Sequence, residues 1–307
     1  MIANEKYFLG SPKLKTLIYE KTDRSNAIVN FNKGYYQDME WYYPQLTELT
    51  TNYSVIKIPT SATSTIIFNL RKFSLSNVHF RRAISYAIDK KGLMDACFPG
   101  SALAHGYIPP GLAGYNKELP DYAYNTQMAK EELKLANLPK DYFAKPITIL
   151  RADNYPCREV FEKLVEANLK AAGINADVVH LSYAEIMEKH FKPRDFDIIN
   201  ISFTADFPEA LFMLSDFRSN SQANYSGLSL PEVDSLLNIA GSSSDRYERY
   251  QTYEKIQRLL YENAVTVNLH YHTISIVMQS NVKGFLPTPL GTYYTSMWPV
   301  YLEEDEK

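Results

Sequence analysis

Apolar residues recur at helical spacing after Asn77, and this is the clearest pattern in the chain. The apolar positions on one face of the expected helix are Phe80, Ala83, Ile84, Ala87 and Ile88. The spacing predicts an amphipathic helix that begins at Asn77 and packs this face into the core. Arg81 and Arg82 lie off that face. We expect them on a solvated side of the helix, and contact with a ligand carboxylate is the alternative.

Polar residues at helix starts predict further helices. Asp23 occupies an N-cap position before a short helix that stops at Gly34, and Asn125 does so before a helix that extends to Pro139. The spacing of a capping box, a Ser or Asp followed three residues later by Glu, occurs at Ser182, Ser229 and Asp245. These motifs predict a short helix after residue 182 and longer helices at about residues 230–240 and 245–263.

Stretches rich in β-branched and aromatic residues predict the strands. Residues 147–150 and 174–181 flank a helical stretch at 155–172, a βαβ arrangement that implies parallel strands and a right-handed crossover. The other expected strands are residues 14–19, a strand pair within 53–70, residues 196–203 and residues 265–278. Helices and strands thus alternate, which predicts an α/β fold.

The composition narrows the possible functions. The chain has 307 residues, of which 45% are apolar and 22% charged, as in folded soluble proteins. A net charge of -3 without a cluster of Lys and Arg argues against nucleic-acid binding by this chain. The 24 Tyr residues suit a binding surface, although compositional bias explains the same count. The sequence contains neither a recognisable signal peptide at its start nor an apolar stretch long enough to span a membrane.

Residues with reactive or metal-binding side chains form no known catalytic motif. The patterns HExxH, GxSxG, GxGxxG and the P-loop are absent from the sequence, so we expect no enzyme, no cofactor and no metal. Cys97 and Cys157 fit no metal or redox spacing and are expected to be free buried thiols. His270 and His272 lie on one face of an expected strand. They are interpreted as an ordinary pair, with half of a metal site as the alternative.

Four stretches resemble the peptide and nickel class of solute-binding proteins of ABC importers. Residues 77–89, NVHFRRAISYAID, are similar to the family signature VRxAxxYAID. Residues 106–110, GYIPP, resemble a conserved loop, and residues 204–210, TADFPEA, followed by NYSG at 224–227, resemble a later motif. Residues 4–13, NEKYFLGSPK, are similar to the family's entry into the later part of the first lobe. The resemblance covers essentially the whole chain.

The resemblance implies a fold and a division of the chain. It implies a type II periplasmic-binding-protein-like lobe with a mixed sheet and flanking helices, together with the later part of the first lobe. Residues 1–73 are expected to be part of lobe I, residues 74–273 the complete second lobe, and residues 274–307 a return to lobe I. Since family members are considerably longer, we expect the amino-terminal part of the family fold to be absent from this chain.

The resemblance also implies a function. It implies a non-catalytic protein, a monomer, that captures peptides or similar small solutes by closure of two lobes and delivers them to the permease subunits of an ABC importer. The full-length protein is expected to be a lipoprotein, periplasmic or extracellular and anchored to the membrane. The alternative is a ligand-sensing domain of a cytoplasmic transcriptional regulator with the same fold.

Within the resemblance, Asp206 matches the aspartate that holds the α-ammonium group of bound peptides. A carboxylate and an ammonium in a closed cleft form a charge-assisted hydrogen bond. The alternative is that Asp206 caps the helix expected after Pro208. The same resemblance adds Phe203, Phe207 and Asn224 to the candidate ligand site, with Phe203 near the place of a family tryptophan.

Overall fold

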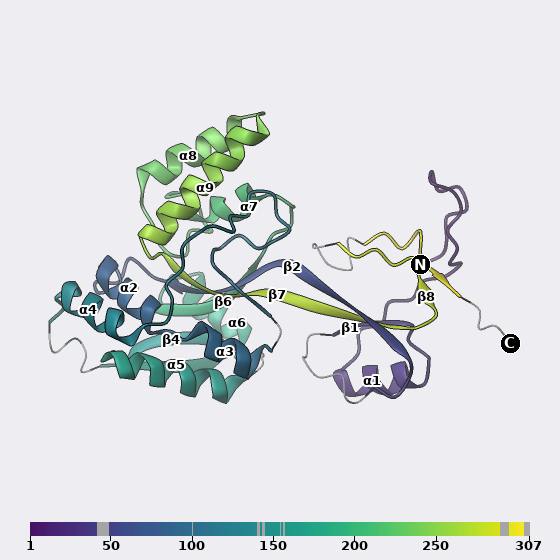
Figure 1. The fold of residues 1–307 in the computed structure, drawn as a ribbon, viewed down its shortest axis with the longest axis horizontal. Coiled ribbons are helices and arrows are strands. Elements are labelled where there is room, and N and C mark those ends of the chain that lie inside the picture. The colour runs from purple at the N-terminus through teal and green to yellow at the C-terminus, as the bar shows by residue number, and fades with distance from the viewer. Residues whose placement is uncertain are drawn as a thin grey trace. The chain divides into compact units, whose positions relative to one another are not determined.

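A computed structural model describes residues 1–41, 49–99, 101–139, 142, 145–153, 155, 157–288 and 295–303 (Figure 1). The chain divides into two compact units, Met1–Thr60 with Thr273–Lys307, and Ser61–His272. Two long strands, β2 (Tyr53–Phe68) and β7 (Thr266–Gln279), contribute residues to both units. The assignment of residues 1–73, 74–273 and 274–307 to lobes stays a prediction.

The larger unit contains a mixed β-sheet with the strand order β7-β2-β6-β4-β5, to which β3 (Ala102–Leu103) adds by pairing with β7. The strand β6 (Ile198–Thr204) is antiparallel to β2 and parallel to β4 (Ile147–Ala152). The strand β5 (Ala176–Leu181) is parallel to β4, which confirms the predicted parallel pairing. Helices flank this sheet, so the predicted α/β fold class is confirmed.

Alternate residues of a strand point to opposite faces of the sheet, so the apolar side chains on each face need their own covering layer. Helical segments cover both faces. On one face, Ile66, Ile149 and Ile198 pack with helices α2, α3, α4 and α5 in one buried cluster. Those helices span Val78–Ala87, Lys90–Cys97, Thr126–Ala136 and Arg158–Ala172. On the other face, their strand neighbours Ile67 and Ile199 pack against the π-helix at Ile186–Phe191, which directly follows α6 (Tyr183–Glu185).

A second cluster of helices in the larger unit has its own core. It contains α7 (Ala210–Leu214), a short 3-10 helix at Ser215–Phe217, α8 (Pro231–Ser242) and α9 (Arg246–Glu262). Val233, Leu237 and Ile256 are fully buried at their contact, together with residues of the loop that follows β3. Figure 1 shows α8 and α9 side by side, with α7 next to them.

The smaller unit contains α1 (Arg24–Asn32), β1 (Asp38–Trp41), β8 (Val282–Lys283) and β9 (Tyr301–Leu302). The strand β1 pairs antiparallel with the second half of β7, and β8 pairs antiparallel with β9. Phe31 of α1 is fully buried against Met39 and Val277.

Most predicted helix starts are confirmed by side-chain caps. Asp23, Asn77, Asn125 and Asp245 each accept hydrogen bonds from backbone N–H groups in the first turn of a helix, and Ser182 and Glu185 form the predicted capping box. Asp89 caps α3 by accepting from the Gly92 amide. Ser229 is different, because α8 begins after Leu230 without a side-chain cap and has Pro231 in its first turn.

Two predicted strand assignments are wrong. Residues 14–19 form no strand, and only an isolated bridge joins Thr16 to Ile2. Ile18 is 80% exposed, so its apolar side chain is not part of a core. Residues 53–70 contain one long strand, β2, in place of a strand pair. The backbone remains extended from Tyr53 to Phe68 and continues through Pro59 without a turn.

Arg81 is buried, which contradicts the predicted solvated position. Its side chain is only 3% exposed, and its guanidinium donates to the carbonyl oxygens of Leu75, Ser76, Asn263 and Ala264. Burial lowers the pKa of Arg81 to about 10, which leaves it charged at neutral pH. The guanidinium therefore joins the segment before α2 to the segment after α9, and its donors are not available to a ligand. Arg82 makes a single described bond of this kind, to the Glu262 carbonyl.

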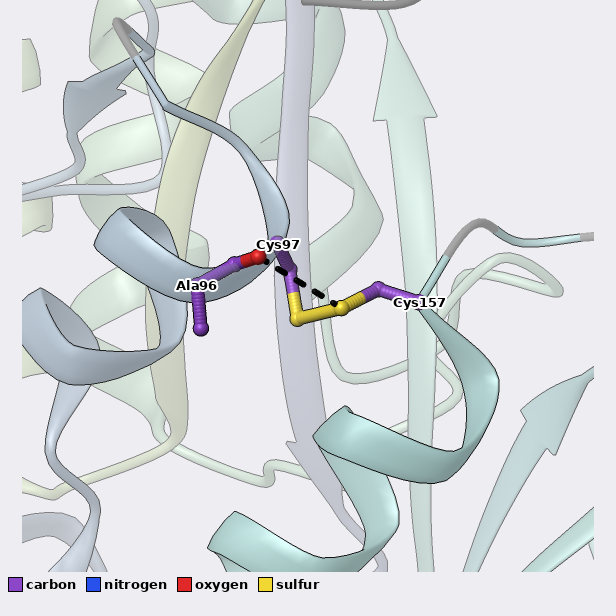
Figure 2. Close-up of a disulfide and its surroundings, with 3 residues drawn as sticks. All are labelled: Ala96, Cys97 and Cys157. Atoms are coloured by element: carbon purple, nitrogen blue, oxygen red, sulfur yellow. Dashed lines mark hydrogen bonds between the residues drawn. A yellow bond between two sulfur atoms is a disulfide. The ribbon is translucent and has the colours of Figure 1, made fainter.

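The two cysteines form a disulfide, so the prediction of free thiols is wrong (Figure 2). Cys97 is the last residue of α3 and Cys157 directly precedes α5. Their Cα atoms lie 5.3 Å apart, a normal distance for a disulfide. Sequence spacing missed the pair because 60 residues separate the cysteines and only the packing of α3 on α5 brings them together.

Replacing both cysteines by alanine is expected to lower the free energy of unfolding by about 3 to 4 kcal/mol. A disulfide that closes a loop of this length restricts the unfolded chain, and its removal restores that freedom. Urea unfolding of the two proteins measures the difference, and a reductant should shift the midpoint of the wild type alone. Coincident unfolding curves, or alkylation of both cysteines in unreduced unfolded protein, would contradict the disulfide.

Candidate functional site

The segment after β6 presents three exposed residues, Asp206, Phe207 and Pro208, between two fixed points. At its start, the Ala205 amide donates to the Ser61 carbonyl at 2.9 Å, and the Ser61 hydroxyl donates back to the Ala205 carbonyl at 2.9 Å. This attaches the end of β6 to β2. We call residues 205–209 the β6 turn.

The loop that follows β3 fixes the other end of the β6 turn. The Ala113 amide donates to the Pro208 carbonyl at 3.0 Å, and the Ala210 amide donates to the Ala113 carbonyl at 2.8 Å. Gly114 makes this approach possible. Its φ is +95°, and a Cβ there would lie 2.5 Å from a Tyr253 ring carbon and 2.8 Å from the Ala210 Cβ.

Glu209 adds a side-chain anchor to the β6 turn. Its carboxylate accepts from Arg249 Nε at 2.9 Å and from the Tyr253 hydroxyl at 2.7 Å, both on α9. Burial alone would raise the pKa of Glu209, but the hydrogen bonds from Tyr253 and Arg249 outweigh it and hold the pKa below its usual value. The β6 turn is thus held by backbone and side-chain bonds, which limits the conformational entropy that a ligand would have to remove.

Asp206 is the exposed carboxylate of this turn, and no hydrogen bond or ion pair of its side chain occurs among the described residues. The alternative prediction, that Asp206 caps a helix, is wrong. Helix α7 begins only at Ala210, and the residue at its N-cap position is Glu209, whose side chain makes no capping bond. The carboxylate of Asp206 is therefore available to a positively charged group.

The two predicted phenylalanines lie at different depths. Phe203, on β6, is half-buried, and its ring lies 5.6 Å from that of Tyr107, which in turn packs edge-on against Phe217. Phe207 is 62% exposed on the β6 turn, and its ring meets Phe212 of α7 edge-on at 5.5 Å. The structure thus places Phe207 beside Asp206 at the surface and Phe203 in a layer of packed aromatic rings.

Asn224 is buried in its own loop. Its amide group donates to the carbonyl oxygens of Arg218 and Leu228 and accepts from the Ser226 hydroxyl and the Gly227 amide. These bonds show that the Asn224 side chain stabilises the conformation of its loop. Its predicted contact with a ligand stays a prediction, and these contacts add no support to it.

The sequence did not indicate the pair of Tyr107 and Asp216, in which Tyr107 also belongs to the layer of packed aromatic rings. The Tyr107 hydroxyl donates to Asp216 Oδ2 at 3.0 Å. Burial raises the pKa of Asp216 from 3.8 to about 6, an effect that the hydrogen bond from Tyr107 only partly offsets. No motif reveals this pair, because 109 residues separate the two side chains.

Replacing Asp216 by Asn is expected to stabilise the protein above pH 6 and to have progressively less effect as the pH falls toward 4. The folded state favours the neutral carboxyl, so the stability that this group contributes is fully present below pH 3.8 and is lost as the pH rises through about 6. Asparagine still accepts from Tyr107 but carries no charge. Thermal melts from about pH 4 to pH 8 should show a gain of about 1 to 2 kcal/mol at the upper end. A gain independent of pH would contradict the assignment.

His270 and His272 form a stacked pair, with ring centroids 4.7 Å apart. His270 also stacks on Phe98 at 4.3 Å, and His272 Nε2 shares a hydrogen bond with the Ser202 hydroxyl at 2.9 Å. Burial lowers the pKa of His270 to about 3 and that of His272 to about 4, so both rings are neutral at physiological pH. Among the described residues, no group of three or more His, Cys, Asp or Glu side chains could hold a metal ion.

Comparison with known proteins identifies the family to which the chain belongs. The sequence model for the middle part of the bacterial extracellular solute-binding proteins, family 5, matches residues 1–225, which include the β6 turn. The chain belongs to this family of solute-binding proteins. This is a family of solute-binding proteins and not of enzymes, which agrees with the prediction from the sequence.

Individual relatives support the assignment. The dipeptide-binding protein of Escherichia coli (strain K12) is 26% identical over 305 residues, which cover 95% of this chain and 56% of the relative. The structure of an ABC transporter substrate-binding protein, CtaP, from Listeria monocytogenes matches with a TM-score of 0.89 at 20% identity, over 98% of this chain and 63% of that one. The structure of the oligopeptide-binding protein AppA from Bacillus subtilis, in complex with a nonapeptide, matches with a TM-score of 0.78 at 22% identity, over 99% and 63%.

The matches cover only part of each relative. The chain spans about half to two thirds of the length of its relatives, since the matched share of the dipeptide-binding protein is 56%. The structures that match at low identity show the shared fold. In the part of the chain that the structure describes, no helix has the length and apolar character needed to cross a bilayer.

Proposed function

We propose that this solute-binding protein captures short peptides for an ABC importer and that Asp206 binds the α-ammonium group of the peptide. The observation that carries the proposal is the exposed carboxylate of Asp206, without a partner among the described residues, on a turn that is fixed at both ends. Because the backbone of the turn is already held, only the Asp206 side chain has to be ordered when an ammonium group binds, and the pair forms a charge-assisted hydrogen bond.

The functions of relatives support peptides as the ligand class. One relative is a dipeptide-binding protein, and the structure of a protein of the same fold is in complex with a nonapeptide. A free amino end is common to such ligands, whatever their side chains. Recognition at this end would therefore suit a protein that accepts several peptides.

We further propose that the protein works outside the cytoplasm, as a monomer that is anchored to the membrane as a lipoprotein and docks on permease subunits. The disulfide between Cys97 and Cys157 supports this location, because such bonds persist in oxidising compartments and are rare in the cytoplasm. The disulfide disfavours the alternative of a cytoplasmic ligand-sensing domain. The family description, extracellular solute-binding proteins, supports the same location.

The direct test is calorimetric titration of the protein, as its gene encodes it, with a panel of unmodified di- and tripeptides. We expect at least one class of peptide to bind in a 1:1 complex. Native mass spectrometry of protein purified from a peptide-rich medium should show the mass of such a ligand. Absence of binding to every peptide, together with purification of the protein with a ligand that lacks an amine, would refute the proposal.

A further inference from the structure

The disulfide between Cys97 and Cys157 has an aromatic residue close in sequence on each side. Phe98 directly follows Cys97 and occupies the C-cap position of α3. Tyr155 precedes Cys157 by two positions, in the segment between β4 and α5. Figure 2 shows the disulfide joining the end of α3 to the start of α5. It therefore restrains the backbone next to both aromatic residues.

Tyr155 supports the last part of β6. The described pairing of β6 with β4 ends at Asn200, whereas β6 continues to Thr204. Beyond that pairing, the Ser202 amide donates to the Tyr155 hydroxyl at 3.2 Å. A backbone amide that is shielded from water needs an acceptor, so Tyr155 replaces the strand partner that β4 no longer supplies.

Phe98 is connected to the same serine through two histidine rings. The Phe98 ring stacks on His270 at 4.3 Å, and His270 stacks on His272 at 4.7 Å. His272 Nε2 shares a hydrogen bond with the Ser202 hydroxyl at 2.9 Å. His270 is buried, and close-packed rings transmit a displacement to their neighbours. The amide and the hydroxyl of Ser202 thus both depend on side chains that lie beside the disulfide.

Ser202 is also close to the β6 turn in the chain. Only Phe203 and Thr204 separate it from residues 205–209, and both belong to the extended strand β6, paired with β2. An extended strand has little slack, so a shift of Ser202 moves the start of the turn. The contacts of Ser202 therefore contribute to the position of the turn that carries Asp206.

Cys157 is the half of the disulfide that a reductant can reach. It is partly exposed, whereas Cys97 is 7% exposed. Its φ is +65°, in the left-handed region that residues other than glycine rarely adopt. Such a conformation persists only where the surrounding structure holds it, and the disulfide is one of the bonds that do so. Cleavage of the disulfide would remove this restraint.

From these contacts we infer that the disulfide is a redox-sensitive restraint on the β6 turn, and that its reduction by a dithiol weakens peptide binding. This inference rests on the proposed function. A thiolate of the dithiol attacks Cys157 Sγ, the S–S bond breaks, and Cys97 leaves as a thiolate that takes up a proton. The second thiol of the dithiol then displaces Cys157 from the mixed disulfide. The protein gains two thiols, and the dithiol is oxidised to a disulfide.

Hydrogen exchange of the unliganded protein tests the restraint itself. In dithiothreitol, we expect the amides of residues 202–209 to exchange about tenfold faster than in the disulfide-bonded protein, because local opening becomes easier. The amides of α8, which detect a general loosening of the fold, should keep their rates. Unchanged exchange at residues 202–209, or the same acceleration in α8, would overturn the inference.

Calorimetry tests the consequence for binding. The probe is the member of the panel of unmodified di- and tripeptides that binds most tightly to the disulfide-bonded protein. Reduction should weaken its binding about threefold to tenfold, because the peptide then has to order the turn. The variant with both Cys97→Ala and Cys157→Ala should bind as weakly as the reduced protein and should not respond to dithiothreitol.

Tyr155→Phe tests the contact with Ser202 while the disulfide stays intact. It removes only the hydroxyl, so the disulfide-bonded variant should exchange faster at residues 202–209 and bind the peptide about threefold more weakly. Tyr183→Phe is the control, since it removes an exposed hydroxyl from the same unit and should behave as the wild type. If Tyr155→Phe also behaved as the wild type, the inference would be wrong.

The two measurements separate this inference from the proposed function. If the disulfide-bonded protein bound no peptide, the proposed function would fail, whereas faster exchange at residues 202–209 on reduction would still support the restraint. If reduction accelerated exchange but left the affinity for the peptide unchanged, the link between the disulfide and binding would be refuted and the proposed function would stand.

Discussion

Asp206→Asn is expected to weaken the binding of peptides with a free amino end by about thirty-fold or more. Loss of one member of a desolvated charge pair commonly costs about 2 to 5 kcal/mol. Asparagine has almost the same shape, so the variant removes the charge and leaves the β6 turn intact. Because the Asp206 side chain is exposed and has no hydrogen bond among the described residues, the melting temperature should not change.

The control for Asp206→Asn is Asp177→Asn, which removes another exposed carboxylate from the same unit. It should bind peptides as the wild type does, because a distant surface charge contributes little in physiological salt. Calorimetry with one peptide gives the affinities of all three proteins. If Asp206→Asn matched the wild type, the amine-binding role of Asp206 would have to be abandoned.

Arg81→Met is expected to destabilise the larger unit by about 3 to 5 kcal/mol. The guanidinium satisfies the carbonyl oxygens of Leu75, Ser76, Asn263 and Ala264, and methionine leaves these buried acceptors without a donor. Two of the acceptors follow directly on α9, at the negative end of its helix dipole, where a cation is favourable.

Arg82→Met is the matched control for this prediction. Arg82 is the neighbouring residue of the same helix, and its described bond to the Glu262 carbonyl is exposed, so the variant should lose at most about 1 kcal/mol. Urea unfolding of the three proteins measures both differences. Similar losses in the two variants would show that Arg81 does not hold α2 to the end of α9.

The sequence predicted the local elements well, because their signals lie within one helix or strand. Asn77, Asn125 and Asp245 are followed by helices that they cap, since a side-chain oxygen close to unpaired amides has the same effect in any fold. Ser229 shows the limit of such reasoning. Pro231 already fills a first-turn position that needs no donor, and the helix begins there without the serine.

Long-range packing explains the errors. Arg81 was assigned to a solvated face because its helix was considered alone, whereas residues about 180 positions later cover it. The same holds for Cys97 and Cys157, which only the packing of α3 and α5 brings together. A pattern within one element does not contain this information.

The candidate site was predictable only in part. The resemblance to the family singled out Asp206, and the structure adds that the carboxylate is exposed and not a cap. The anchors of the β6 turn, Ser61, Ala113 and Arg249, come from separate parts of the chain and carry no motif. Asn224 belonged to a recognisable motif, yet its amide is engaged within its own loop.

The central claim, that Asp206 binds the amino end of a peptide, is tested most directly by a double-mutant cycle. It measures the affinities of the wild type and Asp206→Asn for one peptide and for the same peptide with its amine acetylated. We predict that either change alone weakens binding about thirty-fold or more and that the second change then adds little, a coupling of about 2 kcal/mol or more. If the two losses were independent and multiplied, Asp206 and the amine would not interact, and the account would be wrong.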